Sequence, residues 1–387
     1  MSIRNILLVA RWPVGGIRTH LKYVYPLLYT RLPQLQITCI VPRTDQAEIL
    51  ERDLAALPVK YIYLPRSCSA RSITGAVNEA LRLGSFDLVH SHGFTAACAS
   101  APVTKLRRVP HLTTVHDIVQ DSQFRGLKGV AKKVGMRVLL RMVDRVHAVS
   151  GDVKENLACH FGGGLARRVR VVRNGILTRP VLEATASGLR SELQMDPKTL
   201  LIGFFGRFMG QKGFRYLIEA VRLLRQQLGI EAFHVVAFGG GGFVREEKAA
   251  IERAGLGSSF TFFPFTPDVA GALKAVDVVV IPSLWEASSL LGMEAMVAGV
   301  PIIGTSCIGL SEVLADTPAT IVPPADGAAL AEAVIREART SSHAVAAAFV
   351  PQAVARFDVA DRVPELLALM QELVGPAAAD QLRDSQC

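Results

Sequence analysis

Residues 200–228 read LLIGFFGRFMGQKGFRYLIEAVRLLRQQL, and this stretch has the pattern of a strand, a loop and a helix in succession. Residues 200–205 are a short, continuous apolar run, typical of a strand that is buried on both faces of a parallel sheet. A loop with glycines follows at residues 206–213, and residues 214–228 then place their apolar side chains on one face of a helix. A strand, a glycine-containing loop and a helix in this order predict a βα unit.

The same rhythm extends from this unit in both directions along the chain. Upstream, we predict strands at residues 5–10, 35–41, 60–64, 87–90, 110–115, 145–149 and 169–172. Downstream, we predict strands at residues 232–238, 259–263, 276–281, 300–304 and 319–322, helices at residues 244–254 and 289–298, and a final apolar-faced helix at residues 357–374. The sequence therefore predicts an α/β fold with two Rossmann-like, doubly wound parallel sheets.

The length of 387 residues exceeds what one hydrophobic core usually serves, so two domains are expected. The rhythm is lost over residues 178–198, which contain Pro180 and Pro197. We predict a first domain at residues 1–180, a linker at 181–198, a second domain at 199–352, and a C-terminal helix and tail at 353–387 that pack back toward the first domain. Ligands of such sheets bind at the carboxyl ends of the strands, so a central cleft that both domains face is the expected site.

Composition restricts the class of protein. Half of the residues are apolar and a fifth are charged, as in ordinary globular proteins. No stretch approaches the roughly 18–20 uninterrupted apolar residues of a membrane span, and residues 1–10 resemble a first strand more than a signal peptide. The six cysteines, at positions 39, 68, 98, 159, 307 and 387, form neither a CxxC pair nor a metal-ligand cluster. We expect a cytoplasmic protein with reduced cysteines and no structural zinc.

Charge is distributed unequally along the chain. Residues 1–180 carry 27 Lys+Arg against 11 Asp+Glu (+16), and residues 181–387 carry the remaining 16 against 23 (−7), which sum to the net charge of +9. A basic half suggests that one domain faces a polyanion or an anionic membrane, although charge could also have drifted between two domains without function.

The loop after the first predicted strand contains Gly15 and Gly16, and the helix that follows carries His20. A glycine pair between strand and helix lets the backbone approach a phosphate, which the N–H groups of the helix start can bind. The loop is not a GxGxxG motif, and no acidic residue follows at the spacing that holds a dinucleotide ribose, which disfavours a dehydrogenase. A tight turn without a ligand is the alternative.

The loop at residues 206–213 carries Arg207 and Lys212 beside glycines. Two cations there could clamp a diphosphate and stabilise the negative charge that grows on a leaving nucleoside diphosphate. The alternative is two solvated loop cations.

The third motif is a pair of glutamates, Glu286 and Glu294, after the predicted strand at residues 276–281. Glu294 lies within an apolar helical run, where a carboxylate is costly unless it is paired or binds a ligand. The spacing fits one carboxylate at a donor sugar and the other at ribose hydroxyls, with the helix start at Ser288, Ser289 and Leu290 aimed at the diphosphate. A glutamate satisfied by the backbone is the alternative for either residue.

The segment PSLWEASSLLGMEAMVAGVPIIG, residues 282–304, resembles the E-x7-E signature of the retaining GT-B-fold glycosyltransferases (glycosyl transferases group 1). The Arg207 and Lys212 loop is similar to the phosphate clamp of that family, and the Gly15-Gly16 loop with His20 is similar to its N-terminal loop. The segments around His90 and His92, His116, Ser150 and Asn174 also follow in the order of the family. The resemblance covers nearly the whole chain.

The resemblance implies a role for each matching residue. Glu294 would hold the nucleotide ribose, Glu286 the donor sugar hydroxyls, and Arg207 and Lys212 the diphosphate, with the Gly16 amide assisting. His116 would contact the distal hydroxyl of the sugar or the acceptor side. Family members are thought to retain anomeric configuration by front-face attack, in which the leaving phosphate takes the proton of the acceptor. We therefore expect no cofactor and no metal, in agreement with the lack of a DxD motif.

The chain departs from the family pattern at three places. Gln211 stands where many members carry an acidic residue, the usual aspartate after Asn174-Gly175 is missing, and residues 239–242 are four glycines. These departures affect the expected donor and the shape of the loops more than the reaction class.

A basic amphipathic helix is predicted within residues 124–147. Lys133, Arg137, Arg141 and Arg145 recur every four residues, with Lys128 and Lys132 beside them and apolar residues between. Such a helix is suited to an anionic membrane surface, each cation contributing about 1 kcal/mol, although a solvated face packed on the sheet is the alternative. Nucleic acid is disfavoured, because no aromatic residues interleave the cations.

Taken together, these motifs predict a glycosyltransferase that moves a sugar from a nucleotide-sugar donor to a glycan or lipid-linked acceptor in polysaccharide or glycolipid biosynthesis. We expect it to lie in the cytoplasm, peripherally at the inner face of the inner membrane. A GT-B-like nucleotide-sugar epimerase and a catalytically inert glycan-binding relative are the alternatives.

Overall fold

The computed structural model describes residues 3–375, so the end of the expected tail, with Cys387, lies outside the described residues. The chain forms two compact units. Residues up to Asn174 and from Val359 onward make the first unit, and residues 175–358 make the second. Within the described residues, the five other cysteines are free thiols, and no helix is long and apolar enough to cross a membrane.

The first unit is a seven-stranded parallel sheet in the order β3-β2-β1-β4-β5-β6-β7. Its strands are β1 (Asn5–Ala10), β2 (Gln36–Pro42), β3 (Val59–Leu64), β4 (Leu88–His92), β5 (His111–Val115), β6 (Arg145–Ala148) and β7 (Val169–Val171). Its helices are α1 (Gly16–Arg31), α2 (Asp45–Asp53), α3 (Ala70–Leu83), α4 (Phe94–Arg107), α5 (Gly126–Leu140), α6 (Gly151–Phe161), α7 (Gly163–Ala166) and α17 (Val363–Val374), with 3-10 turns η1 (Asp121–Phe124) and η4 (Val359–Asp361).

The second unit is a six-stranded parallel sheet in the order β10-β9-β8-β11-β12-β13. Its strands are β8 (Leu200–Phe205), β9 (Phe233–Phe238), β10 (Phe260–Phe263), β11 (Val278–Ile281), β12 (Ile302–Thr305) and β13 (Thr320–Val322). Its helices are α8 (Thr178–Glu183), α9 (Leu189–Glu192), α10 (Phe214–Leu228), α11 (Val244–Arg253), α12 (Val269–Lys274), α13 (Leu290–Val297), α14 (Ser311–Leu314), α15 (Gly327–Arg339) and α16 (His343–Phe357), with 3-10 turns η2 (Gly210–Lys212) and η3 (Gly257–Ser259).

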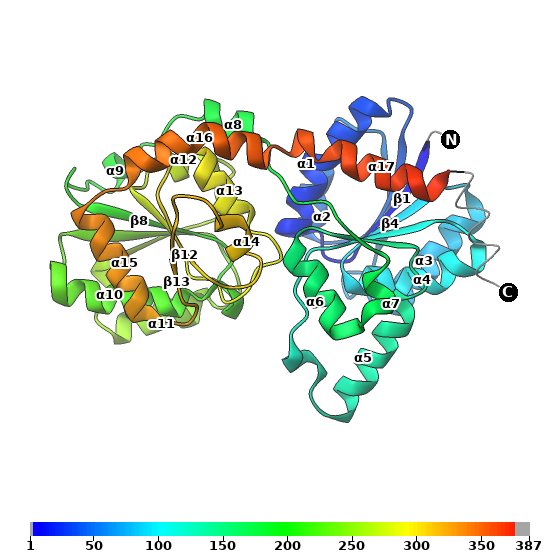
Figure 1. Cartoon of the computed structure of the whole chain (residues 1–387), viewed down its shortest axis with the longest axis horizontal. Coiled ribbons are helices and arrows are strands. Elements are labelled where there is room, and N and C mark those ends of the chain that lie inside the picture. Colours follow the sequence, from blue (N-terminus) through cyan, green and yellow to red (C-terminus); the bar gives the residue numbers. More distant parts are fainter. Residues whose placement is uncertain (1–2, 376–387) are drawn as a thin grey trace. The chain divides into compact units, whose positions relative to one another are not determined.

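Both sheets have helices on both faces, as the continuous apolar strands require. In the second unit α10 and α15 pack together on one side of the sheet, while α13 and α16 pack together on the other (Figure 1). Phe204, Phe208 and Phe214 form the aromatic centre of this core, with edge-to-face contacts between the Phe204 and Phe214 rings at 4.7 Å. The predicted α/β fold with two doubly wound sheets is confirmed.

Strand order reverses once in each sheet, between β1 and β4 in the first unit and between β8 and β11 in the second. The loops that leave the carboxyl ends of two such strands diverge to opposite faces and leave room for a ligand. All of the predicted site residues follow one of these four strands or the neighbouring β5. His20 lies on α1, the helix that follows β1.

The end of the chain differs from the prediction of one helix over residues 357–374. Helix α16 ends at Phe357, η4 intervenes, and α17 begins only at Val363. Pro364 lies in the first turn of α17, a position that proline favours. Helix α17 contacts α1 and β4, and Arg145 pairs with Glu372 at 2.8 Å, all within the first unit.

The unit boundaries also differ from the expected ones. The chain leaves the first unit after Asn174 and returns to it at Val359. Residues 181–198, expected to be a linker, belong to the second unit, where α8 and α9 lie. Lys274 donates two hydrogen bonds to the carbonyls of Leu182 and Ala184, at 2.8 and 2.7 Å, which attaches this segment to α12.

Candidate functional site

The loop after β1 brings the chain into α1 through Gly15, which has φ 52° and ψ −131°. A side chain would strain this conformation, so glycine is required there. Gly16 opens the helix, and a Cβ added to it would meet nothing within 4 Å. The first N–H groups of α1 have no partners within the helix and are available to an anion. The space over Gly16 allows close approach of a ligand to the backbone.

A buried row of hydrogen bonds runs behind this loop, at the carboxyl ends of β4, β5 and β6. Tyr25 Oη lies 2.8 Å from His90 Nδ1, His90 Nε2 lies 2.7 Å from Thr114 Oγ1, Thr114 Oγ1 lies 3.0 Å from His147 Nδ1, and His147 Nε2 lies 2.8 Å from the Val172 carbonyl. A carbonyl can only accept, so His147 Nε2 carries a proton and each preceding donor is fixed in turn. Every hydrogen bond of the row is therefore donated in the same direction: Tyr25 donates to His90, His90 to Thr114, Thr114 to His147, and His147 to the Val172 carbonyl.

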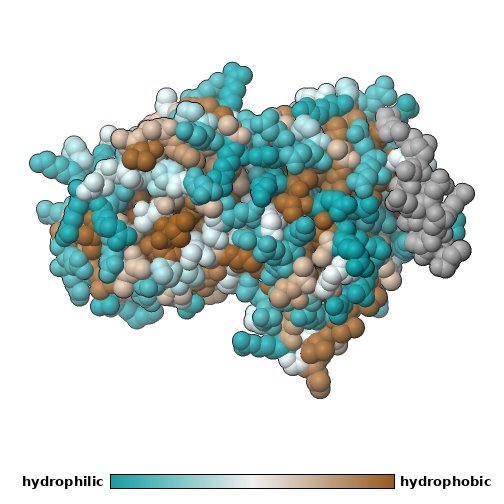
Figure 2. Space-filling view, viewed as in Figure 1, coloured by the Kyte–Doolittle hydropathy of each residue, from teal (hydrophilic) through white to brown (hydrophobic). Residues whose placement is uncertain are grey.

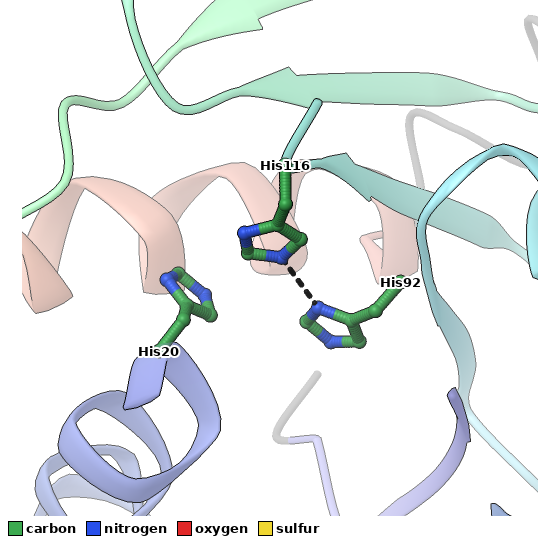
Figure 3. A group of neighbouring side chains, drawn as sticks. All are labelled: His20, His92 and His116. Atoms are coloured by element: carbon green, nitrogen blue, oxygen red, sulfur yellow. Dashed lines mark hydrogen bonds between the residues drawn. The ribbon is translucent and has the colours of Figure 1, made fainter. Parts of the chain in front are cut away.

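A second histidine group lies beside this row and consists of His20, His92 and His116 (Figure 3). His20 comes from α1, His92 ends β4, and His116 follows β5 directly. His92 Nδ1 lies 3.0 Å from His116 Nε2, and His20 Nδ1 lies 3.2 Å from Asn174 Oδ1. An amide oxygen accepts, so His20 Nδ1 carries the proton and His20 Nε2 presents a lone pair.

Burial lowers the pKa of all three imidazoles in this group. The pKa of His20 falls to about 3, because desolvation and repulsion from His147 outweigh the hydrogen bond to Asn174. The pKa values of His92 and His116 fall well below 6.5, chiefly by desolvation. All three rings are therefore neutral near pH 7 and can accept a proton, donate one, or bind a metal ion.

In the second unit, hydrogen bonds join the loop that follows β8 to the loop that follows β11. The Leu284 amide donates to the Gln211 carbonyl at 2.8 Å, and Gln211 Nε2 donates to the Trp285 carbonyl at 2.8 Å. Gly213 has φ 63°, and a Cβ there would lie 1.9 Å from the Pro282 carbonyl oxygen. The amide of Gln211 explains one departure from the family pattern, because a carboxylate at this position could not donate to a carbonyl.

Glu286 lies at the centre of these two loops and is buried, with 7% of its surface exposed. Its Oε1 accepts hydrogen bonds from Lys212 Nζ at 2.6 Å and from Ser283 Oγ at 2.7 Å, and its backbone N–H donates to the Ile308 carbonyl at 2.9 Å. The predicted diphosphate cation Lys212 and the predicted sugar carboxylate Glu286 are thus brought into direct contact. A charge-assisted pair of this length fixes the position of both side chains.

Helix α13 begins directly after this pair. Ser289 caps the helix, since its hydroxyl accepts from the Gly292 amide at 3.4 Å, and Ser288 and Leu290 are partly buried on either side of it. Glu294 is partly buried, one turn along α13 from Leu290, so that both lie on the same face of the helix. Glu286, the start of α13 and Glu294 thus follow one another along this loop and helix.

Arg207 follows β8 and is exposed, unlike Lys212 in the same loop. Within residues 3–375 it has no ionic partner. The structure thus brings Lys212 to Glu286 and leaves Arg207 available to an anion.

Helix α5 differs in one respect from the predicted basic stripe. The helix ends at Leu140, and Arg141 caps it, so Arg145 lies on β6 and pairs with Glu372 instead of extending the stripe. Arg137 Nε donates to the Phe161 carbonyl at 2.8 Å. Lys132 and Lys133 place their ammonium groups 5.6 and 5.4 Å from the Phe124 ring. The cations of α5 therefore partly pack on their own unit.

The exposed apolar residues of α5 were not singled out as exposed by the sequence. Leu127 is 91% exposed, and Val130, Val134 and Val138 are also exposed. Their spacing of three or four residues places them on one face of the helix. Figure 2 shows hydrophobic surface at the projecting end of α5.

Sequence reasoning also missed Ser283 and the contact of His20 with His92 and His116. Ser283 is fully buried and lies in the loop that leads from β11 to Glu286. A serine just after a predicted strand was the sequence signal that could have identified it. His90 and His92 are two apart on one strand, so they share a face, but only the tertiary fold brings α1 to them.

Comparisons with known proteins give a family for both units. The Glycosyltransferase Family 4 profile matches residues 14–179, and the profile of the glycosyl transferases group 1 matches residues 199–339. The 2-deoxystreptamine N-acetyl-D-glucosaminyltransferase of Streptomyces fradiae is 29% identical over 76% of this chain and 72% of its own length. The D-inositol 3-phosphate glycosyltransferase of Pseudarthrobacter chlorophenolicus is 25% identical over 60% of this chain, which spans 57% of that relative.

Solved structures share the fold. The Anabaena protein HepE in complex with UDP-glucose aligns over 95% of this chain and 100% of its own, with a TM-score of 0.79 and 20% identity. The sucrose-phosphate synthase of Thermosynechococcus elongatus aligns over 96% of this chain and 99% of its own, with a TM-score of 0.77 and 18% identity. The predicted GT-B fold is confirmed by these likenesses.

Proposed function

Because the chain belongs to the glycosyl transferases of group 1, within Glycosyltransferase Family 4, we propose that it transfers a sugar from a nucleotide-sugar donor to an acceptor and retains the anomeric configuration. The observation that carries the proposal is the contact of Lys212 with Glu286 at the point where strand order reverses in the second sheet. A cation and a carboxylate there suit the two charged or polar parts of a nucleotide sugar, its diphosphate and its sugar hydroxyls.

The roles of the side chains follow from their positions in the second unit. Arg207 is exposed and Lys212 is held by Glu286, so a diphosphate at the start of α13 would receive one free and one positioned cation. Both cations and the helix start stabilise the charge that develops on the leaving diphosphate. Glu286 accepts from sugar hydroxyls with its remaining lone pairs, and Glu294 accepts from ribose hydroxyls one turn further on.

The first unit contributes a neutral imidazole and a free helix start. His116 has its pKa lowered by burial, so it can exchange hydrogen bonds with a hydroxyl of the sugar without adding a charge. The open space over Gly16 permits a phosphate oxygen to reach the first N–H groups of α1. Neither role requires a nucleophilic side chain or a metal ion, in keeping with attack on the face of the leaving group.

Replacement of Glu286 by Gln tests the proposal. The amide keeps the size of the side chain but has no negative charge to attract Lys212. We therefore expect the rate of nucleoside diphosphate release during turnover to fall by about 10²-fold or more. Glu246→Gln is the matched control, because Glu246 is exposed on α11. Unchanged turnover in Glu286→Gln would favour the inert glycan-binding alternative. Conversion of the donor sugar without release of the nucleotide, in the absence of acceptor, would favour the epimerase.

The donor base can be found by a thermal-shift screen with UDP-, GDP- and ADP-sugars, because a bound donor raises the unfolding temperature by mass action. UDP-glucose belongs in the screen, since HepE binds it. The names of the two curated relatives point to polyhydroxylated ring acceptors, so inositol phosphates belong in the acceptor panel beside lipid-linked glycans.

For the acceptor we favour a substrate at an anionic membrane surface, used in glycolipid or polysaccharide biosynthesis. The supporting feature is α5, where Leu127, Val130, Val134 and Val138 face away from the buried Gly129 and Leu140. At 100° per residue, Lys128 lies on one side of this apolar stripe and Lys133 and Arg137 lie on the other, while Lys132 lies almost opposite it. An exposed apolar stripe bordered by cations fits a headgroup boundary better than solvent.

Vesicle co-sedimentation tests the membrane proposal. We expect binding to vesicles that contain phosphatidylserine or phosphatidylglycerol, weaker binding to neutral phosphatidylcholine vesicles, and loss of binding when salt is raised. The double variant Leu127→Ser/Val134→Ser should lose binding. Leu106→Ser, a matched change of an exposed leucine on α4, should not. Equal binding to neutral and anionic vesicles would overturn the proposal.

A further inference from the structure

Two buried imidazoles and one partly buried imidazole meet at one point, whereas the neighbouring histidines of the row are all paired. His20, His92 and His116 each offer one ring nitrogen, and these three nitrogens lie within 4.8 Å of one another (Figure 3). In contrast, both ring nitrogens of His90, His111 and His147 have hydrogen-bond partners on the protein. The first group is therefore not explained by the hydrogen-bond pattern that accounts for the second.

Two ring nitrogens of the group are buried and have no partner. These are His20 Nε2, which is a candidate ligand atom, and His92 Nε2, which lies on the other side of its ring from the nitrogen that faces His116. A buried polar atom without a partner costs free energy unless a ligand or water satisfies it. Both residues are more than nine-tenths buried, so bulk solvent does not satisfy these atoms.

The orientation of His20 is that of a prepared ligand. Its Nδ1–H donates to Asn174 Oδ1, which leaves the Nε2 lone pair directed at the other two rings. The ring centroids of His20 and His116 are 4.9 Å apart and meet edge to face. Metal-binding histidines are commonly held in this way, with the second nitrogen donating to an oxygen that fixes the tautomer.

We propose that His20, His92 and His116 form a binding site for one divalent transition metal ion of the Zn²⁺ type. Three imidazole nitrogens suit Zn²⁺, Co²⁺ or Ni²⁺, whereas Mg²⁺ and Ca²⁺ require oxygen ligands. Three protein ligands leave a fourth position of the tetrahedron open to water or to an anion.

The geometry requires only small movements. With metal–nitrogen bonds of about 2.0–2.1 Å, ligand nitrogens of a tetrahedral ion lie about 3.4 Å apart. His92 Nδ1 and His116 Nε2 are already 3.0 Å apart. When the ion binds between them, the ring that carries the shared proton would carry it on its other nitrogen instead and stay neutral. Since all three nitrogens lie within 4.8 Å, the widest pair would close by at most roughly 1.4 Å (4.8 less 3.4), within the reach of ring rotation.

Occupation of the site has a consequence for activity. This consequence rests on the proposed function, in which His116 contacts the donor sugar, whereas metal binding itself does not rest on it. An ion that engages His116 would remove that contact, so Zn²⁺ would inhibit transfer in competition with the donor.

The direct test uses full-length protein without a polyhistidine tag, treated with a chelator and desalted. Titration with Co²⁺ should give the intense visible absorption of a tetrahedral ion, saturating at one equivalent, and Zn²⁺ should abolish it by displacement. X-ray absorption of the Zn²⁺-loaded wild type should show three imidazole ligands, and this readout does not depend on how well any variant folds. A six-coordinate Co²⁺ spectrum, or no binding, would overturn the site.

Variants locate the ion. His20→Gln and His92→Gln should each weaken Co²⁺ binding by more than tenfold, and Asn174→Ala, which removes only the support of His20, should weaken it by about 10–100-fold. Cys159→Ser and His343→Gln alter an exposed thiol and an exposed imidazole outside the group and should leave binding unchanged. Loss of binding in Cys159→Ser would mean that the ion binds elsewhere and would overturn the proposal. Binding without inhibition would overturn the competition with the donor and leave the site intact.

Discussion

Lys212 Nζ lies 2.6 Å from Glu286 Oε1, although the two residues are 74 positions apart in the chain. The contact joins the loops that leave β8 and β11, the two strands between which strand order reverses. It couples the cation that the family resemblance assigns to the diphosphate with the carboxylate that it assigns to the sugar. The position and charge of the two side chains are therefore interdependent.

Replacement of Lys212 by Met should affect both function and stability. Under the proposed function it removes a cation from the leaving group, so turnover should fall by about 10²-fold. It also leaves the buried Glu286 with Ser283 as its one remaining side-chain donor among residues 3–375, which should lower the free energy of unfolding by about 1.5–3 kcal/mol. Steady-state kinetics and urea unfolding measure the two effects.

A double-mutant cycle that combines Lys212→Met with Glu286→Gln measures the interaction free energy between the two side chains, apart from the contribution of each one alone. If the contact matters as described, the double variant should be more stable than the sum of the two single effects predicts, by about 0.5–3 kcal/mol. Additive effects would show that the pair contributes nothing to stability.

Gly213→Ala should disrupt the junction of the two loops. Gly213 has φ 63°, and a Cβ would lie 1.9 Å from the Pro282 carbonyl oxygen, so the backbone must shift. We expect a loss of about 1–3 kcal/mol of stability and weaker donor binding. Gly210→Ala, three residues away in the same loop with nothing within 4 Å of its Cβ, should change stability by less than about 0.5 kcal/mol. Equal melting temperatures for the two variants would contradict the geometry.

Gly16→Ala should separate ligand binding from folding. Because a Cβ at Gly16 meets no atom, stability should stay the same or rise by up to about 1 kcal/mol. The KM for the donor should rise on the order of tenfold if a phosphate oxygen approaches this backbone, since the methyl group would hold it off. Gly15→Ala is the contrasting variant, because φ 52° with ψ −131° is strained for alanine and stability should fall. An unaltered KM in Gly16→Ala would show that the phosphate does not contact this helix start.

The buried histidines predict how stability depends on pH. Burial lowers the pKa of His20 and His111 to about 3 and that of His147 to about 4. In the unfolded chain the same side chains have a pKa of about 6.5, so below that pH the unfolded state binds more protons than the folded state. The free energy of unfolding should therefore fall as pH drops from about 6.5 toward 4, by about 1.4 kcal/mol per pH unit for each such histidine.

Urea unfolding at a series of pH values measures this slope. His111→Gln should reduce it, because one proton-binding difference is removed, while His343→Gln, which changes an exposed residue, should leave it unchanged. A stability that stays constant from about pH 6.5 to pH 5 would show that the buried imidazoles are charged or solvated in the folded protein.

Local pattern was sufficient for most of the fold. The predicted strand at residues 200–205 and helix at residues 214–228 coincide with β8 and α10, because a short apolar run and a period of 3.6 residues determine these elements locally. The break between α16 and α17 was missed because apolar periodicity continues through it; Pro364, in the first turn of α17, was the local signal of a new helix start. The end of α5 was likewise missed, because basic residues recur every four positions beyond Leu140.

The sequence by itself determined the two βα series, the glutamate pair and the basic loop, because each is written in contiguous residues whose spacing carries the signal. Only the tertiary structure decided which of these residues meet. Lys212 reaches Glu286, and His20 reaches His92 and His116, because parallel strands distant in sequence end at one edge of a sheet. Burial, which sets the charge state of the histidines and the exposure of the α5 stripe, likewise depends on the assembled neighbours and not on local pattern.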